Sequence, residues 1–267
     1  MTAGPAIVRA IAAGHRAIVR SIDALDDDGL RAPTLLPGWD RVTILCHLRY
    51  GADAVGRMTA AALAGETTLF YPGGRAEQRP GTLHPQTGES VGDVVASFTA
   101  RCDALDAQLA GLQPDDFSVE VVEPAGVFDI GPQTVEELLT LRLTEVEVHA
   151  GDLLLGLDVW SPTFVAAGLP LRFSRLANRL ANQPPIDLSY EGTWLLRTTE
   201  GDAWTVTVAP RRAEVRIADY DTRSDATITS SRRDLLALLL GRPLETEAVY
   251  SGDTELAAAF SKAFPGP

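Results

Sequence analysis

Four long helical patterns occupy the first 155 residues and constrain the fold more than any other feature of the sequence. They span about 6–26, 40–64, 90–112 and 134–155, with apolar side chains recurring every three or four positions. Four helices of this length in one compact segment predict a four-helix bundle. Bundles of this kind often build metal sites from side chains on facing helices.

The predicted helix ends carry recognisable capping residues. Asp40 is a good N-cap for the second helix, and Thr134 with Glu137 forms a capping-box pattern at the start of the fourth. Gly65 and Gly156 are candidates to end the second and fourth helices, because glycine adopts the left-handed conformation that helix ends favour.

The composition changes after Leu157. Short segments rich in β-branched and aromatic residues follow, separated by turns, and they predict a mostly antiparallel sheet. The predicted strands are 192–199, 204–208, 213–217 and 226–229, and the predicted helices are 162–181, 231–240 and 253–264. The fold class is therefore predicted as α+β, with a bundle over 1–157 and a smaller α+β domain over 158–267.

The charge balance excludes several classes of partner. The chain has 23 Lys and Arg against 36 Asp and Glu, a net charge of −13. Such a surface repels nucleic acids and anionic membranes. The N-terminus reads as an amphipathic helix, and no apolar run approaches the length of a membrane span. We therefore expect a cytoplasmic protein, a monomer or homodimer, whose Cys46 and Cys102 stay reduced.

Two residues of the fourth helical pattern suggest a metal site. Glu145 and His149 are four positions apart, so they lie on one helix face and suit zinc or a similar divalent ion. His47, inside the second pattern, is a plausible third ligand. Two plainer readings stay open at this point: a helix-surface contact for Glu145 with His149, and a core histidine for His47.

The neighbours of these three residues receive separate predictions. Glu147 lies off the Glu145–His149 face and is predicted to be solvated. Asp152 either orients the His149 imidazole or lies on the surface. Cys46 points about 100° round the helix from its neighbour His47 and is predicted to fill the core.

The connection over 65–89 is rich in Pro and Gly and unusually long. Loops of this length are often functional. Aromatic and cationic residues within it, including Tyr71 and Arg79, predict a lid or a ligand-contact loop.

These segments together resemble a known family. Leu36-Pro37-Gly38-Trp39, followed by Leu45-Cys46-His47-Leu48, resembles the opening of mycothiol-dependent maleylpyruvate isomerase-like enzymes, a DinB-like group of metal-binding four-helix bundles. The segment from Glu145 to Leu153 is similar to the second metal segment of that family. Tyr71-Pro72-Gly73-Gly74, with Arg79 after it, is similar to its loop. The region from about residue 190, including Leu239-Leu240-Gly241-Arg242, resembles its sterol-carrier-like second domain.

The resemblance implies roles for particular residues. His47, Glu145 and His149 would be the ligands of a divalent metal, zinc by preference. Arg79 would contact substrate or cofactor in the catalytic site, and we extend the cofactor site to Tyr71 of the same loop. Arg242 is the match for an arginine of the second domain that assists catalysis. Arg211 and Arg212 are rival matches, and both Arg242 and Arg79 have a plain alternative as solvated cations.

The implied cofactor, mycothiol, is a low-molecular-weight thiol, and a metal with an open position favours the thiolate form that acts as nucleophile. We rank S-transfer to a small electrophile first and cis–trans isomerisation of the maleylpyruvate type second. Metal-activated water would instead give a hydrolase or amidase. A non-catalytic small-molecule-binding protein is the remaining alternative.

Overall fold

The computed structural model describes residues 3–127, 130–182, 190–209 and 212–266. The chain divides into two compact units, Met1–Phe164 and Val165–Pro267, and each is described by itself. Helix α7 (Pro162–Asn182) continues across this division. The first unit is helical and the second contains the main sheet, so the predicted α+β class is confirmed.

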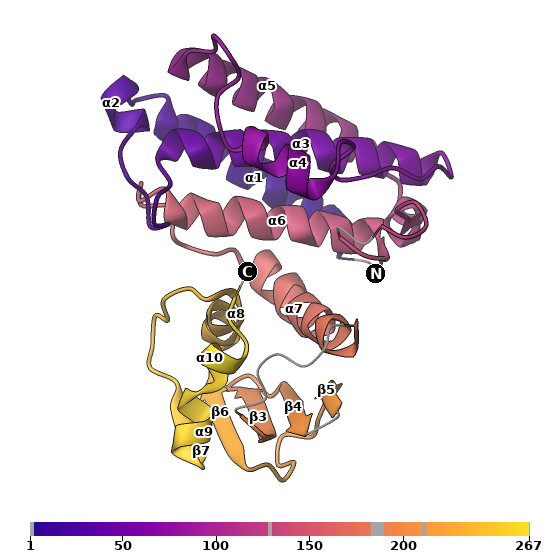
Figure 1. The fold of residues 1–267 in the computed structure, drawn as a ribbon, viewed down its shortest axis with the longest axis vertical. Helices are drawn as coiled ribbons and strands as arrows, with labels where there is room; N and C mark the ends of the chain where they lie inside the picture. The colour runs from indigo at the N-terminus through magenta and orange to yellow at the C-terminus, as the bar shows by residue number, and fades with distance from the viewer. Residues whose placement is uncertain (1–2, 128–129, 183–189, 210–211, 267) are drawn as a thin grey trace. The chain divides into compact units, whose positions relative to one another are not determined.

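Four long helices form the first unit, as the sequence predicts (Figure 1). They are α1 (Gly4–Ile22), α3 (Arg41–Leu63), α5 (Val91–Ala110) and α6 (Val135–Asp152). Helices α1 and α3 each pack against both α5 and α6, so the four close into a bundle around one core. The shorter elements of this unit are α2 (Asp27–Leu30), α4 (Arg75–Thr82), η1 (Pro114–Ser118), β1 (Glu120–Val121) and β2 (Gln133–Thr134).

The helix starts follow the predicted caps. The Asp40 carboxylate accepts from the backbone N–H of Thr43, and Thr134 with Glu137 forms a complete capping box. At the end of α3, Gly65 takes the left-handed conformation with φ of 70°, and its N–H donates to the Ala62 carbonyl. These caps satisfy backbone groups that a helix end otherwise leaves unpaired.

One predicted helix end is wrong. Helix α6 ends at Asp152 with Leu153 as C-cap, not at Gly156, and Leu154 adopts a φ of +56°. The Arg41 side chain donates to the Leu153 carbonyl at 2.9 Å. The Leu153 carbonyl at the helix end is therefore satisfied by a tertiary contact and not by a glycine cap. Local sequence rules cannot predict such a contact.

Helix α4 lies within the long connection and was not predicted. Pro80 and Gly81 fall inside it, and both residues weaken a helical pattern in the sequence. The connection is thus partly helical.

No helix among the described residues is long and apolar enough to cross a membrane.

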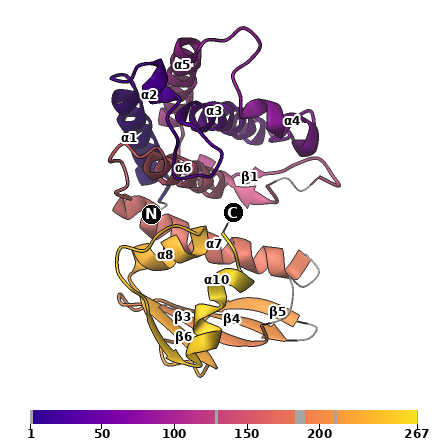
Figure 2. The same cartoon turned by 60° about the vertical axis from the view of Figure 1, so that its left-hand side comes forward.

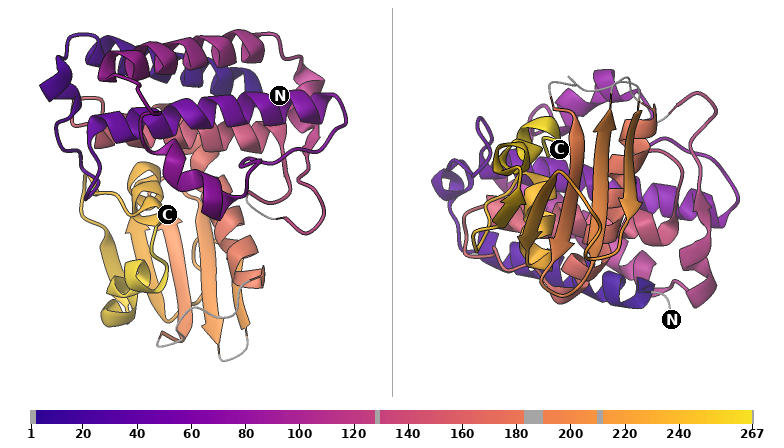
Figure 3. Two further views of the ribbon diagram at one scale, coloured as in Figure 1. Left: turned by 45° about the horizontal axis from the view of Figure 1, so that its top comes forward. Right: turned by 90° about the horizontal axis from the view of Figure 1, so that it is seen from below.

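The second unit is built around a five-stranded sheet in the order β5-β4-β3-β6-β7 (Figures 2 and 3). Among the strand pairings of the described residues, only β3–β6 is parallel, so the sheet is mostly antiparallel. Its strands are β3 (Gly192–Thr198), β4 (Ala203–Ala209), β5 (Arg212–Ile217), β6 (Ala226–Ser230) and β7 (Val249–Gly252). Its other helices are α8 (Arg232–Leu240), α9 (Thr254–Ala258) and α10 (Phe260–Ala263).

Aromatic contacts fix helices on one face of this sheet. Phe173 of α7 stacks on Trp204 of β4, with ring centroids 4.3 Å apart, and Phe260 of α10 packs edge-on against Trp194 of β3. Trp194 and Trp204 lie on the same face, because Trp194 pairs with Val206 and strand side chains alternate. Strand β7 escaped prediction because all four of its residues are exposed and lack an apolar alternation.

Candidate metal centre

Three side chains from two facing helices converge in the first unit. His47 comes from α3, and Glu145 and His149 come from α6. The Glu145 Oε2 atom lies 2.7 Å from His47 Nε2 and 3.3 Å from His149 Nε2. One ligand atom from each residue lies within 4.8 Å of the others, a spacing that one metal ion can bridge. The structure thus brings together the three residues that the sequence singled out.

The second nitrogen of His149 is also engaged. Its Nδ1 lies 2.8 Å from Oδ2 of Asp152, whose side chain is only 1% exposed. A carboxylate only accepts, so Nδ1 carries a hydrogen toward Asp152, and Nε2 is the ring nitrogen that faces Glu145 and would bind a metal after losing its own proton. Of the two readings left open for Asp152, the structure supports the one that orients the imidazole.

Trp39 packs against both imidazoles. Its ring is nearly parallel to that of His149, with centroids 6.1 Å apart, and meets the His47 ring edge-on at 5.6 Å. In the sequence, Trp39 stands out only as the last residue of the Leu36-Pro37-Gly38-Trp39 motif. Its position limits rotation of both rings, which helps to keep their nitrogens directed at one point.

The electrostatics of the centre favour an ion pair when no metal is bound. Burial lowers the pKa of His149, but the Asp152 and Glu145 carboxylates outweigh burial and raise that pKa to about 9. Burial opposes ionisation of Glu145, yet hydrogen bonds from His149 and His47 hold its pKa well below the usual range. A cation that binds here therefore replaces a proton on His149, so its affinity depends on pH.

The comparisons with known proteins point the same way. Residues 11–154 match the sequence profile of the family described as the mycothiol maleylpyruvate isomerase N-terminal domain. The chain belongs to this family. The match confirms the predicted resemblance, and the family is named after an enzyme, the class of protein that the sequence predicted.

Two solved structures share the fold. One is a mycothiol-dependent maleylpyruvate isomerase, with a TM-score of 0.65 and 19% identity. The other is a histidine-to-alanine mutant of a mycothiol-dependent maleylpyruvate isomerase, with a TM-score of 0.66 and 18% identity. Each comparison covers 95% of this chain and 95% of the other. A search of curated proteins gives no significant match.

The two loop residues predicted to contact cofactor lie together near the centre. Tyr71 is 4% exposed, and its ring stacks on that of Tyr50 at 5.1 Å. Burial raises the pKa of the Tyr71 phenol and the Glu145 carboxylate adds to this, while the cations Arg75 and Arg79 act in the opposite direction. Arg79 lies on α4 and is half-buried. Their roles toward a ligand stay predictions, and the burial of Tyr71 leaves Arg79 as the more accessible group.

Arg242, the arginine predicted to assist catalysis, belongs to the second unit. Arg242 follows α8 and its Nη1 donates to the Leu240 carbonyl at 3.3 Å. Arg211 lies outside the described residues, as does the side chain of Arg212. Because each unit is described by itself, the contribution of Arg242 to catalysis stays a prediction.

The prediction for Glu147 is wrong. This side chain is not solvated but 8% exposed, and its carboxylate accepts from the backbone N–H and the hydroxyl of Ser161 at 2.6 and 2.5 Å. Burial raises the pKa of Glu147. Glu147 contacts the segment that leads into α7, a tertiary partner that its place on the helix wheel does not reveal.

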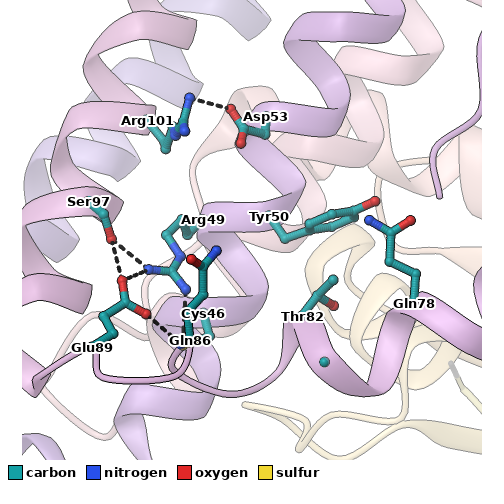
Figure 4. A pocket seen from close by; sticks show the side chains of 11 residues that line it. Cys46, Arg49, Tyr50, Asp53, Gln78, Thr82, Gln86, Glu89, Ser97 and Arg101 are labelled. Atoms are coloured by element: carbon teal, nitrogen blue, oxygen red, sulfur yellow. Dashed lines mark hydrogen bonds and ion pairs between the residues drawn. The ribbon is translucent and has the colours of Figure 1, made fainter. Parts of the chain in front are cut away.

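A cleft of about 510 Å³, lined mainly by residues with polar side chains, lies between α3, α4 and α5 (Figure 4). Its charged side chains are paired with each other: Arg49 with Glu89, and Arg101 with Asp53 at 3.1 Å. Amide and hydroxyl groups supply most of the remaining lining, from Gln78, Thr82, Gln86 and Ser97. Tyr50, which stacks on Tyr71, forms one wall.

Both cysteines are buried and unreactive in character. Burial raises the pKa of Cys46 to about 11 and that of Cys102 to about 12, so both are protonated thiols at neutral pH. The core position predicted for Cys46 is confirmed, since it is 0% exposed. Cys46 is also one of the residues that border the cleft.

Proposed function

We propose that this protein is a mycothiol-dependent metalloenzyme that adds the cofactor thiol to a small electrophile. The convergence of His47, Glu145 and His149 is the observation that carries the proposal. Two imidazoles and a carboxylate suit zinc and leave a coordination position for a thiol. Family membership supports mycothiol as that thiol. We place the enzyme in the cytoplasm, where free thiols stay reduced.

The residues of this chain have distinct tasks in such a site. Asp152 holds Nδ1 of His149 and so directs Nε2 toward the site, and Trp39 restricts the rings of both histidines. A divalent metal, when bound, supplies one effect: it favours the thiolate form of a thiol at neutral pH. Arg79, a cation next to Tyr71, is suited to orient an anionic group of substrate or cofactor.

Two outcomes follow from the same first step. In S-transfer, the sulfur bonds to an electrophilic carbon and another group leaves. In isomerisation, the sulfur adds to a carbon–carbon double bond, the resulting single bond rotates, and expulsion of the thiol restores the double bond. S-transfer remains our general proposal, and the names of the structural neighbours favour isomerisation as the specific alternative.

The first test is metal analysis of the purified full chain. We expect about one divalent ion per wild-type chain, and far less in His47→Ala. His84→Ala is the matched control, because His84 is exposed and outside the centre. Equal metal in wild type and His47→Ala would refute the metal centre. Turnover of an electrophile panel that includes maleylpyruvate, with and without mycothiol, then separates thiol chemistry from hydrolysis.

We further propose that the cleft of Figure 4 receives the uncharged, hydroxyl-bearing part of the thiol cofactor. Its ionised groups neutralise each other, and its amides and hydroxyls match hydroxyl groups. Thr82→Trp fills the cleft and should weaken mycothiol binding about tenfold, while binding of N-acetylcysteine and metal stays unchanged. Glu77→Trp places the same side chain on the exposed face of α4 and serves as control. Equal mycothiol affinity in the two variants would refute this assignment.

A further inference from the structure

A buried network of hydrogen bonds connects one residue from each of the four long helices of the bundle. Asp106 of α5 lies 2.8 Å from His15 Nδ1 of α1. His15 Nε2 lies 2.9 Å from Arg142 Nη2 of α6, and Arg142 Nη1 donates to the Leu48 carbonyl of α3 at 2.9 Å. His15 and Arg142 are each only 1% exposed. The network therefore crosses the core from α5 to α3.

The chemistry of the groups fixes the direction of every bond. A guanidinium only donates, so His15 Nε2 accepts from Arg142. The Asp106 carboxylate only accepts, so His15 Nδ1 carries the hydrogen. The imidazole is thus neutral and joins one cation to one anion. Burial favours this state because it lowers the pKa of His15, and Arg142 acts in the same direction; together they outweigh Asp106, which raises that pKa.

Stability alone does not explain a guanidinium at this depth. Removing a cation from water is costly, and the Arg142 Nε–H has no hydrogen-bond partner among the described residues. Gly51 leaves the space that Arg142 needs, because a Cβ there would lie 3.0 Å from Nη1. The best-attested use of buried charged and polar groups is to fix the register of packed helices.

The network acts on the two helices that carry the candidate ligands. Arg142 precedes Glu145 by three positions, about one turn of α6, and Leu48 directly follows His47 on α3. A slip of one residue along a helix moves its side chains by about 1.5 Å and turns them by about 100°. Such a slip would carry His47 away from Glu145.

We propose that Arg142 is a positioning residue for the His47–Glu145–His149 site. Its bond to the Leu48 carbonyl fixes the axial register of α3 against α6, and its bond to His15 of α1 holds the guanidinium in place for that contact. This inference rests on the proposed metal centre for its function, but the register itself can be measured without metal.

The test compares cobalt(II) binding by full-chain variants. Arg142→Met retains an unbranched side chain, replaces the guanidinium by an apolar end, and removes the hydrogen bonds to Leu48 and His15. We expect its cobalt(II) affinity to fall at least about tenfold, with shifted cobalt absorption bands that report altered ligand geometry. Leu109→Ala is the matched control, because it truncates a buried side chain of α5 outside the network. Equal affinity and identical bands in the two variants would overturn the inference.

A second pair of variants decides the matter if Arg142→Met does not fold. His15→Gln retains one acceptor for Arg142 and one donor for Asp106, so it should bind cobalt(II) within about threefold of wild type. His15→Phe retains neither and should lose about tenfold in affinity. Equal loss in both would show that the hydrogen bonds are irrelevant.

Nuclear Overhauser contacts in the metal-free protein separate this inference from the proposed function. Contacts between the Trp39 ring and the rings of His47 and His149 should survive in wild type and vanish in Arg142→Met. A wild type that binds no cobalt would refute the metal centre. Survival of these ring contacts in Arg142→Met would then overturn the positioning role as well.

Discussion

Two buried histidines of the bundle make the same contact and acquire opposite character. His149, in the candidate metal centre, and His15, in the middle of the core, each engage an aspartate through Nδ1 at 2.8 Å. The pKa of His149 is nonetheless raised to about 9, whereas burial lowers the pKa of His15. The difference lies at Nε2, which faces the Glu145 carboxylate in one case and the Arg142 guanidinium in the other.

This comparison shows that a histidine–aspartate pair does not by itself define a function. With a carboxylate at Nε2, the imidazole is protonated, and a metal ion can replace the proton on Nε2. With a guanidinium at Nε2, it is a neutral bridge between fixed charges. The group that faces Nε2 therefore decides whether a histidine–aspartate pair belongs to a reactive centre or to the structural network that supports it.

The largest expected difference is in direct metal binding. His149→Ala removes a ligand, so metal affinity should fall by more than about 100-fold, beyond the loss typical of a supporting residue. His15→Phe acts only through helix register and should lose about tenfold. Competition with a chelator at pH 7.5 measures both. Comparable losses of metal affinity in the two variants would contradict the distinction between a metal ligand, His149, and a residue that only positions the helices, His15.

The two aspartates should differ next. Asp152→Asn leaves the His149 ring in place but weakens its orientation, which costs roughly 10- to 100-fold in metal affinity for partners of this kind. Asp106→Asn, at the far end of the buried network, should cost less than about tenfold. The same chelator competition measures both metal affinities. A larger loss of metal affinity in Asp106→Asn than in Asp152→Asn would contradict the comparison.

The pH dependence of stability should have opposite signs at the two histidines. In the metal-free protein, the raised pKa of His149 adds stability that is complete below about pH 6.5 and disappears as pH rises through about 9, at most about 3 kcal/mol. The lowered pKa of His15 acts the other way. The unfolded chain takes up the His15 proton first, so stability falls as pH drops below about 6.5.

Urea unfolding of the metal-free protein across this pH range measures both effects. His149→Gln should flatten the alkaline side of the stability profile, and His15→Gln the acidic side, because glutamine does not titrate. If either substitution leaves the slope on its own side unchanged, the assigned charge state of that histidine is wrong.

The smallest expected effect concerns Trp39. Trp39→Phe keeps an aromatic ring against both imidazoles but a smaller one, so metal affinity should fall only about two- to fivefold, or roughly 0.5–1 kcal/mol. In the wild type, metal binding should change the fluorescence of Trp39, and the substitution should remove that change. An unaltered metal-dependent signal in Trp39→Phe would place the responding tryptophan elsewhere.

The sequence by itself determined the features that depend on neighbours along the chain. Helix starts at Asp40 and Thr134, and the pairing of Glu145 with His149 on one face, follow from helical period and capping chemistry. Neighbouring residues predict structure less well where their preferences conflict or are absent. Helix α4 was missed because Pro80 and Gly81 disfavour a helix, and β7 was missed because its exposed residues have no apolar pattern.

Only the tertiary structure decided which polar groups from distant parts of the chain meet. His47 and Glu145 are 98 positions apart, and His15 and Arg142 are 127 apart. Periodicity gives the face of a helix but not the charge that faces it. It therefore mistook Glu147 for a solvated residue and left the role of Asp152 open. The charge state of a buried group depends on the partners that folding brings to it, and those partners lie on other helices.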